Sequence, residues 1–209
     1  MKYIIDAFSG PGGLYMWAIL IVSVVGIAII IERFFYLSFK CRLEKQDFMN
    51  QLAKLVSGGE MEKAIALAKK STSPLGKVLY SILINHNEQE KDIQDAVDEV
   101  FLTESPKIMR WTPLLATVAN LATLLGLLGT IIGLILAFDA VANVPAAQKA
   151  AALATGISVA LATTAFGLTV AIPSLGFHGF LTTKSDRLIE EMDEKSVKMM
   201  HYIVSRRKQ

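Results

Sequence analysis

Polar side chains recur inside apolar stretches of this chain, where each of them needs a physical reason. Asn120, Thr123 and Thr130 follow one another at three- and seven-residue spacings, so a helix would carry all three on one side. Thr164 lies in a later apolar stretch and would lie opposite Thr130 in an antiparallel helical hairpin. Such a polar row can face a cavity or a partner's polar group. The alternative is that each threonine bonds its own helix or braces a neighbouring one.

This polar row (Asn120, Thr123, Thr130 and Thr164) contains no acid or base. An ion pathway needs a group that takes up and releases the ion, and a threonine hydroxyl titrates far too high for that. If the chain conducts ions, we therefore expect another chain to supply a carboxylate. No phosphate-binding glycine loop, metal-ligand cluster or Ser/His/Asp set accompanies the row, so we predict no enzyme, no cofactor and no metal site.

The elements that must position these residues are three long apolar stretches. Charged residues make up only 19% of the 209 residues, whereas a soluble domain carries about a quarter. Residues 7–31, 111–138 and 150–183 contain no Asp, Glu, Lys or Arg. Each is longer than the roughly 20 residues that a helix needs to cross a bilayer. We therefore predict an all-α membrane protein with three transmembrane helices.

Helical periodicity in the middle of the chain and an extension of the third stretch predict a large helical cytoplasmic domain. Lysine and arginine concentrate in the middle segment, which has eleven of them, and this places the N-terminus outside and the C-terminus inside. Eleven acidic residues balance that charge, and nothing indicates a nucleic-acid surface. The predicted parts are an outer N-terminal segment 1–13, transmembrane helix 14–37, cytoplasmic helical domain 38–110, transmembrane helix 111–139, outer turn 140–147, transmembrane helix 148–183 and cytoplasmic helical tail 184–209.

Glycines interrupt the second apolar stretch in "LLGLLGTIIG", residues 124–133. Each glycine costs a helix interior about 1 kcal/mol relative to alanine, so something must compensate for it. Helices in lipid associate through close packing, which small residues permit. The third stretch is equally rich in small residues, so we predict that the two helices pack as a hairpin. The predicted packing glycines are Gly126, Gly129, Gly133, Gly156 and Gly167.

"LLGLLGTIIGLILAF" followed by "GISVALATTAFGLTVAIP" resembles the ExbB/TolQ/MotA proton-channel family, in its ExbB/TolQ branch. The resemblance covers all three spans, the first cytoplasmic loop and the extension of the third span. It implies a homopentamer in the bacterial inner membrane, surrounded by lipid and enclosing the single-span helices of two ExbD/TolR-type partner chains. The membrane aspartate of such a partner carries the proton, and a TonB- or TolA-like transducer passes the work to the envelope.

Carried over by motif, the resemblance places Thr130 of "LLGT" and Thr164 of "ATTAFGL" in the chamber that faces the partner's aspartate. Pro173 closes the segment "AIP" and is grouped with the packing glycines. Two positions depart from the family pattern. Thr123 stands where many relatives have a proline, and Val159 stands where they carry a glutamate.

The resemblance thus implies an ion-driven motor subunit, with the proton as the expected ion and sodium as an alternative. A structural scaffold of the inner membrane, without ion conduction, is the competing hypothesis. A secondary transporter is poorly supported, because three spans show no repeat and no broken helix pair. Which envelope process is powered does not follow from the residues.

Overall fold

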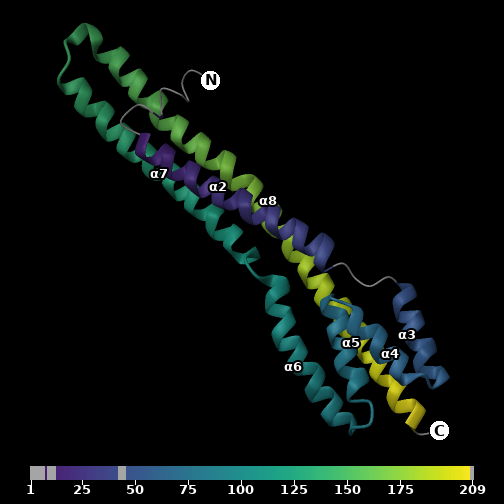
Figure 1. Cartoon of the computed structure of the whole chain (residues 1–209). Helices are drawn as coiled ribbons and strands as arrows, with labels where there is room; N and C mark the ends of the chain where they lie inside the picture. Colours follow the sequence, from purple (N-terminus) through teal and green to yellow (C-terminus); the bar gives the residue numbers. More distant parts are fainter. Residues whose placement is uncertain (1–7, 9–12, 42–45, 208–209) are drawn as a thin grey trace. The chain divides into compact units, whose positions relative to one another are not determined.

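The computed structural model describes residues 8, 13–41 and 46–207, and these residues contain helices and no strand. The predicted all-α class is confirmed. Most of the predicted outer segment 1–13 lies outside the described residues. The elements are α2 (Gly13–Phe35), the π-helix η1 (Tyr36–Lys40), α3 (Gln46–Gly58), α4 (Met61–Lys70), α5 (Pro74–Ile84), α6 (Glu90–Met109), α7 (Thr112–Ala142) and α8 (Ala146–Arg207) (Figure 1).

Three helical stretches are long and apolar enough to cross a membrane. The first includes α2, the second ends with α7, and the third lies within α8. The three predicted spans are therefore confirmed as apolar helices. Helix α8 has 62 residues, about 90 Å at 1.5 Å per residue, which is about three times the apolar thickness of a bilayer. It continues without a break from the third apolar stretch into the charged C-terminal segment.

The chain divides into two compact units. One, the apolar unit, comprises residues 1–32 and 111–180 and holds most of α2, all of α7 and the first part of α8. The other, the polar unit, comprises residues 33–110 and 181–209 and holds η1, α3 to α6 and the rest of α8.

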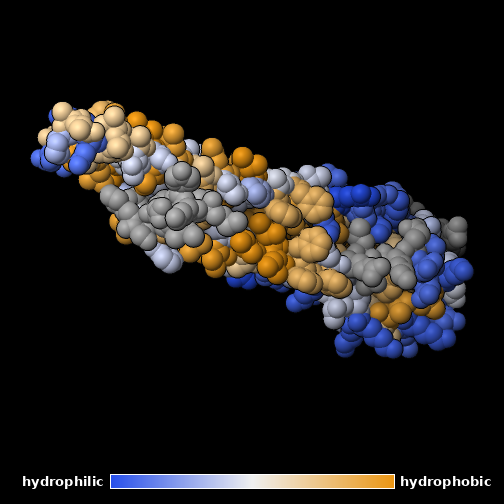
Figure 2. All heavy atoms as spheres, turned by 90° about the horizontal axis from the view of Figure 1, so that it is seen from above, coloured by the Kyte–Doolittle hydropathy of each residue, from blue (hydrophilic) through white to orange (hydrophobic). Residues whose placement is uncertain are grey.

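The apolar unit has small residues where α7 and α8 meet and many large residues on its outer surface. Ala119, Ala122 and Ala171 form its buried cluster. Outward-facing side chains are large, with Leu124 60% and Leu161 63% exposed. Figure 2 shows hydrophobic side chains gathered along the apolar unit. This distribution is the one expected of helices that face lipid or partner helices outside and each other inside.

The polar unit is built around large aliphatic side chains. Helix α4 packs on both α3 and α5, and α5 packs on α6. Leu79, Ile82 and Leu83 of α5 and Ile93 of α6 are fully buried. Helix α5 begins at Pro74, and Ser73 caps it by accepting a 3.0 Å hydrogen bond from the Gly76 N–H.

Two prolines near the start of the second span have different effects. A proline inside a helical stretch can kink or break the helix, so Pro106 and Pro113 could each do either. Helix α6 continues past Pro106 and ends at Met109, and the chain then turns at Trp111, whose φ is 65°. Pro113 falls in the first turn of α7, where its missing N–H costs no helical hydrogen bond.

The connection between α7 and α8 is shorter than the predicted turn at 140–147. Helix α7 continues to Ala142 and α8 starts at Ala146. Alanines flank this turn on both sides, and alanine is the strongest helix former, so the helices extend until Asn143 and Pro145 intervene.

Candidate functional site

The α7–α8 pair brings two backbones into direct contact near the middle of the apolar unit. A Cβ atom added at Gly167 of α8 would lie 2.5 Å from the Ala122 carbonyl oxygen of α7. One added at Gly126 of α7 would lie 3.2 Å from the Thr163 carbonyl oxygen. Any larger residue at Gly167 would therefore push the helices apart.

The same contact continues along the pair in antiparallel register. Gly129 lies against the Thr163 side chain, where an added Cβ would come within 2.8 Å of its hydroxyl oxygen. An added Cβ would lie 2.9 Å from Ala160 at Gly133 and 2.2 Å from Ala137 at Gly156. The structure thus places all five predicted glycines between α7 and α8. Pro173 lies exposed on α8.

The threonines of the polar row all donate their hydroxyl protons to backbone carbonyls. Thr123 donates to Ala119 at 3.0 Å and Thr130 donates to Leu127 at 2.7 Å, both within α7. Thr164 donates across the helix pair to the Gly126 carbonyl at 3.0 Å.

Thr130 and Thr164 lie at similar depth, because the residues that precede them, Gly129 and Thr163, are in contact. Both are half-buried. Asn120 and Thr123 are exposed on the same helix as Thr130. The structure therefore brings Thr130 and Thr164 to the same depth, whereas Asn120 and Thr123 lie closer to the start of α7.

Sequence reasoning did not single out Thr163, which is fully buried between the two helices. Its hydroxyl donates to Ala160 at 2.7 Å and also reaches the Gly126 carbonyl at 3.3 Å. A signal was present in the sequence, since Ala160, Thr163, Gly167 and Ala171 are spaced by three and four residues and so form one small-residue face.

An open groove of about 520 Å³ lies along α7 and α8 between Gly133 and the turn that joins the two helices. Its lining is apolar apart from Gln148 and Thr155, and it includes Val159. Val159 stands at the position where the family pattern described above has a glutamate. In this chain the groove therefore receives no carboxylate from that position.

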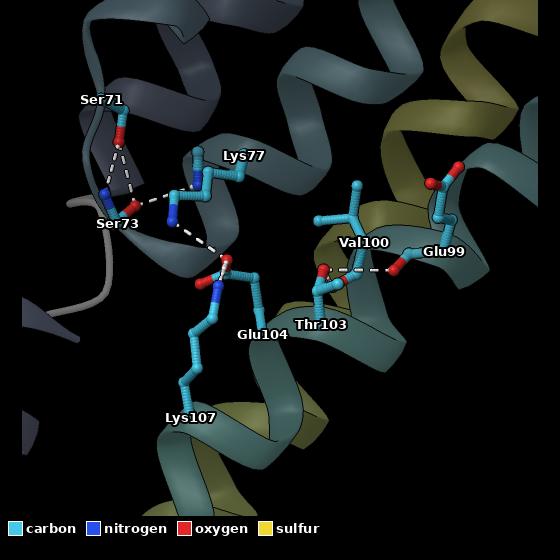
Figure 3. Close-up of polar contacts among 9 residues, drawn as sticks. Ser71, Ser73, Lys77, Glu99, Val100, Thr103, Glu104 and Lys107 are labelled. Carbon is cyan, nitrogen blue, oxygen red and sulfur yellow. Dashed lines mark hydrogen bonds and ion pairs between the residues drawn. The ribbon is translucent and has the colours of Figure 1, made fainter.

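Buried charges occur in the polar unit, around the last turns of α6 (Figure 3). Glu104 is 4% exposed and accepts hydrogen bonds from Lys77 of α5 at 3.0 Å and Lys107 at 2.7 Å. Burial opposes the charged form, but the two lysines outweigh it and hold the pKa of Glu104 below its ordinary value.

A second buried charge, Arg33, is 2% exposed in the last turn of α2. It donates to the carbonyls of Lys107 and Ile108 at 3.1 and 3.4 Å, and its guanidinium lies 4.5 Å from the centre of the Tyr36 ring. These carbonyls belong to the C-terminal turn of α6, which has no intrahelical donors for them. Arg33 therefore caps α6 from another helix, which is a structural role.

The described part of the chain holds no group of three or more His, Cys, Asp or Glu side chains that could bind a metal ion. What the geometry offers chemically is the α7–α8 contact itself: small residues in backbone contact, with hydroxyl oxygens at one level. Among the described residues, no titratable group lies beside these hydroxyls.

This arrangement can be compared with known proteins. The sequence model described as the MotA/TolQ/ExbB proton channel family matches residues 61–194, which include α4 to α7 and much of α8. The chain belongs to the MotA/TolQ/ExbB proton channel family. Its relatives carry ExbB and TolQ names, which confirms the predicted ExbB/TolQ branch.

Among these relatives, the chain is 27% identical over 185 residues to "Biopolymer transport protein exbB1" of Vibrio cholerae, covering 87% of this chain and 80% of that protein. It is 27% identical over 182 residues to "Putative biopolymer transport protein ExbB homolog" of Methanothermobacter thermautotrophicus, covering 87% of this chain and 64% of the relative. "Tol-Pal system protein TolQ" of Pseudomonas aeruginosa is 37% identical over 86 residues, or 41% of this chain and 37% of that protein. This protein is thus a membrane subunit of the proton-channel family.

Proposed function

We propose that this chain is the pentameric inner-membrane subunit of an ion-driven motor, with the proton as the driving ion. Five copies surround the single-span helices of two ExbD/TolR-type partner chains. A membrane aspartate of the partner carries the proton past a ring formed by Thr130 and Thr164. A TonB- or TolA-like transducer then passes the work to an envelope or outer-membrane process.

The observation that carries this proposal is that Thr130 and Thr164 lie at similar depth in the apolar unit. Thr130 and Thr164 come from different helices, lie at similar depth and are partly accessible. Four of the titratable side chains among the described residues of the apolar unit lie near helix ends: Tyr15, Glu32, Asp139 and Lys149. The fifth, His178, lies on α8 about four helical turns from Thr164. The middle of the unit thus offers hydroxyls without a proton carrier, and a partner's carboxylate would complete the pathway.

Family membership supports the partner, and the charge distribution supports the orientation. The polar unit contains most of the lysine and arginine, so it lies in the cytoplasm, and the α7–α8 turn lies in the periplasm. Protons entering along this direction fall through a potential worth about 2.3 kcal/mol per charge per 100 mV.

One observation favours a second candidate, an inner-membrane scaffold without ion conduction. The hydroxyls of Thr123, Thr130 and Thr164 all bond to backbone carbonyls, as threonines that only brace helices do. The two candidates differ in their assembly, because a channel subunit needs a ring of copies around an acidic partner helix and a scaffold does not.

The native mass of the protein in a mild, lipid-like detergent tests the proposal. We expect a pentamer, and in the presence of a co-expressed single-span chain with one membrane aspartate we expect the pentamer to take up two copies of it. A monomer or dimer whose mass is unaffected by the partner would contradict the motor and favour the scaffold.

A further inference from the structure

The hydrogen bonds that favour a scaffold have a consequence for the chemistry of the polar row. A threonine hydroxyl has one proton to donate and two lone pairs with which to accept. Thr130 donates its proton to the Leu127 carbonyl at 2.7 Å, and Thr164 donates its proton to the Gly126 carbonyl at 3.0 Å. The lone pairs of both oxygens remain available, whereas neither has a proton left for an approaching group.

The hydroxyl of Thr164 is held in its hydrogen bond to a carbonyl more firmly than the hydroxyl of a threonine that bonds to its own helix. Its acceptor belongs to the neighbouring helix, and Gly126 lies in backbone contact with α8, because a Cβ added there would lie 3.2 Å from the Thr164 Cα. Because the helices are in backbone contact there, the Gly126 carbonyl cannot move away without separating them. Thr163, fully buried beside it, fills the space against Gly129 and keeps the register fixed.

We infer that Thr130 and Thr164 present hydrogen-bond acceptors only, so that the site selects a proton donor or a cation and disfavours a bare carboxylate. This inference rests on the proposed function and specifies the charge state that the site accepts. A protonated carboxyl group of the partner would donate its O–H to the Thr164 oxygen. A sodium ion would use the same oxygen as a ligand, since hydroxyl oxygens suit hard cations.

The role of Thr164 as an acceptor determines the direction in which it shifts the pKa of the partner's carboxyl group. An acceptor that bonds the neutral acid stabilises the protonated form and raises the pKa of the partner's carboxyl group. If Thr164 instead donated to the carboxylate, it would lower that pKa. Among the described titratable groups of the apolar unit, Tyr15, Glu32, Asp139 and Lys149 lie near helix ends, and His178 lies about four helical turns from Thr164 on α8. None of them therefore faces Thr164 from α2, α7 or α8 to obscure the shift.

The test is proton flux against pH in liposomes that contain the chain together with a single-span partner bearing one membrane aspartate. Thr164→Val removes the acceptor and keeps the shape, and Thr130 remains in place. We expect the pH of half-maximal flux to fall by about 0.5 to 1 unit, the size expected for loss of one hydrogen bond. Thr164→Ser, which keeps a hydroxyl, should keep the midpoint of the parent. Thr169→Val is the matched control, because Thr169 is exposed on α8 and donates to its own Ala165 carbonyl.

Each outcome has a separate meaning. An unchanged or higher pH midpoint in Thr164→Val, with flux present and with the sodium concentration for half-maximal flux also unchanged, overturns the inference. A higher sodium concentration for half-maximal flux, without a pH shift, supports it with sodium as the cation. If the parent complex shows no flux with either ion, the proposed function itself fails. Should Thr164→Val not assemble, Thr164→Cys, whose thiol is a weak acceptor, should lower the midpoint in the same direction.

Discussion

The interiors of the two units of this chain are packed in different ways. Between α7 and α8 of the apolar unit the interior residues are glycine, alanine and threonine, and the contact is made by backbone atoms and small side chains. In the polar unit the interior consists of large aliphatic side chains, with buried charges at its edge. In water, the hydrophobic effect drives large aliphatic side chains into the interior of the polar unit. Lipid is as apolar as leucine and provides no hydrophobic drive between helices, so helices in a membrane associate through close packing of small residues instead.

This difference predicts that the apolar unit is the less tolerant of an added methyl group and the polar unit the less tolerant of a lost charge partner. The two units can be tested separately with variants that have matched controls on the same element.

The largest effect is expected at Gly167. Replacement by valine places branched carbon atoms where even a Cβ would lie 2.5 Å from a backbone carbonyl of α7. We expect a loss of about 3 kcal/mol, at the upper end of the cost of overpacking. Thermal unfolding of the purified protein in detergent measures it. Gly176 lies on the same helix with nothing within 4 Å of an added Cβ, so Gly176→Ala should leave stability unchanged or raise it by up to about 1 kcal/mol. Equal losses in both variants would contradict the close-approach account.

A smaller effect, dependent on pH, is expected at Glu104 in the polar unit. Its pKa is lower when folded, so its contribution to stability is complete above the unfolded pKa, near 4.5, and is lost as the pH falls through the folded value. Glu104→Gln should therefore cost about 1 kcal/mol at neutral pH, and the difference from the parent should shrink in acid.

Urea unfolding of the full chain in detergent between pH 7 and pH 3 measures this dependence. Glu62→Gln, which removes an exposed carboxylate of α4, is the control for the loss of one negative charge. A difference between Glu104→Gln and the parent that stays constant across this range would show that the two lysines do not stabilise the charged form.

Much of the fold could be predicted from the sequence, because the relevant signals are long and local. Three charge-free stretches predicted the apolar helices, and the order serine then proline at Ser73 and Pro74 is a local signal for the start of α5. The end of α6 could not be predicted, because two prolines, Pro106 and Pro113, offered a break and the chain uses neither. The break falls at Trp111, where a positive φ is a product of tertiary structure that no local pattern announces.

The candidate site could be predicted only in part, for a related reason. Glycine spacing indicated which residues could lie between α7 and α8, since a small residue has few other uses in a lipid-facing helix. Thr163 was missed because a threonine in such a stretch fits a polar row as well as a packing face. The direction in which each hydroxyl donates depends on which carbonyl lies nearest in three dimensions, and that information is absent from the sequence.

The most direct test of the central claim is ion flux through the double variant Thr130→Ala with Thr164→Val, co-reconstituted with an acidic single-span partner. The matched control is Thr155→Val with Thr169→Val, two exposed threonines that bond only their own helix. We predict that the test variant assembles with the parent's native mass and loses coupled flux, while the control keeps it. Full flux in the assembled test variant would contradict the claim that Thr130 and Thr164 line the ion pathway.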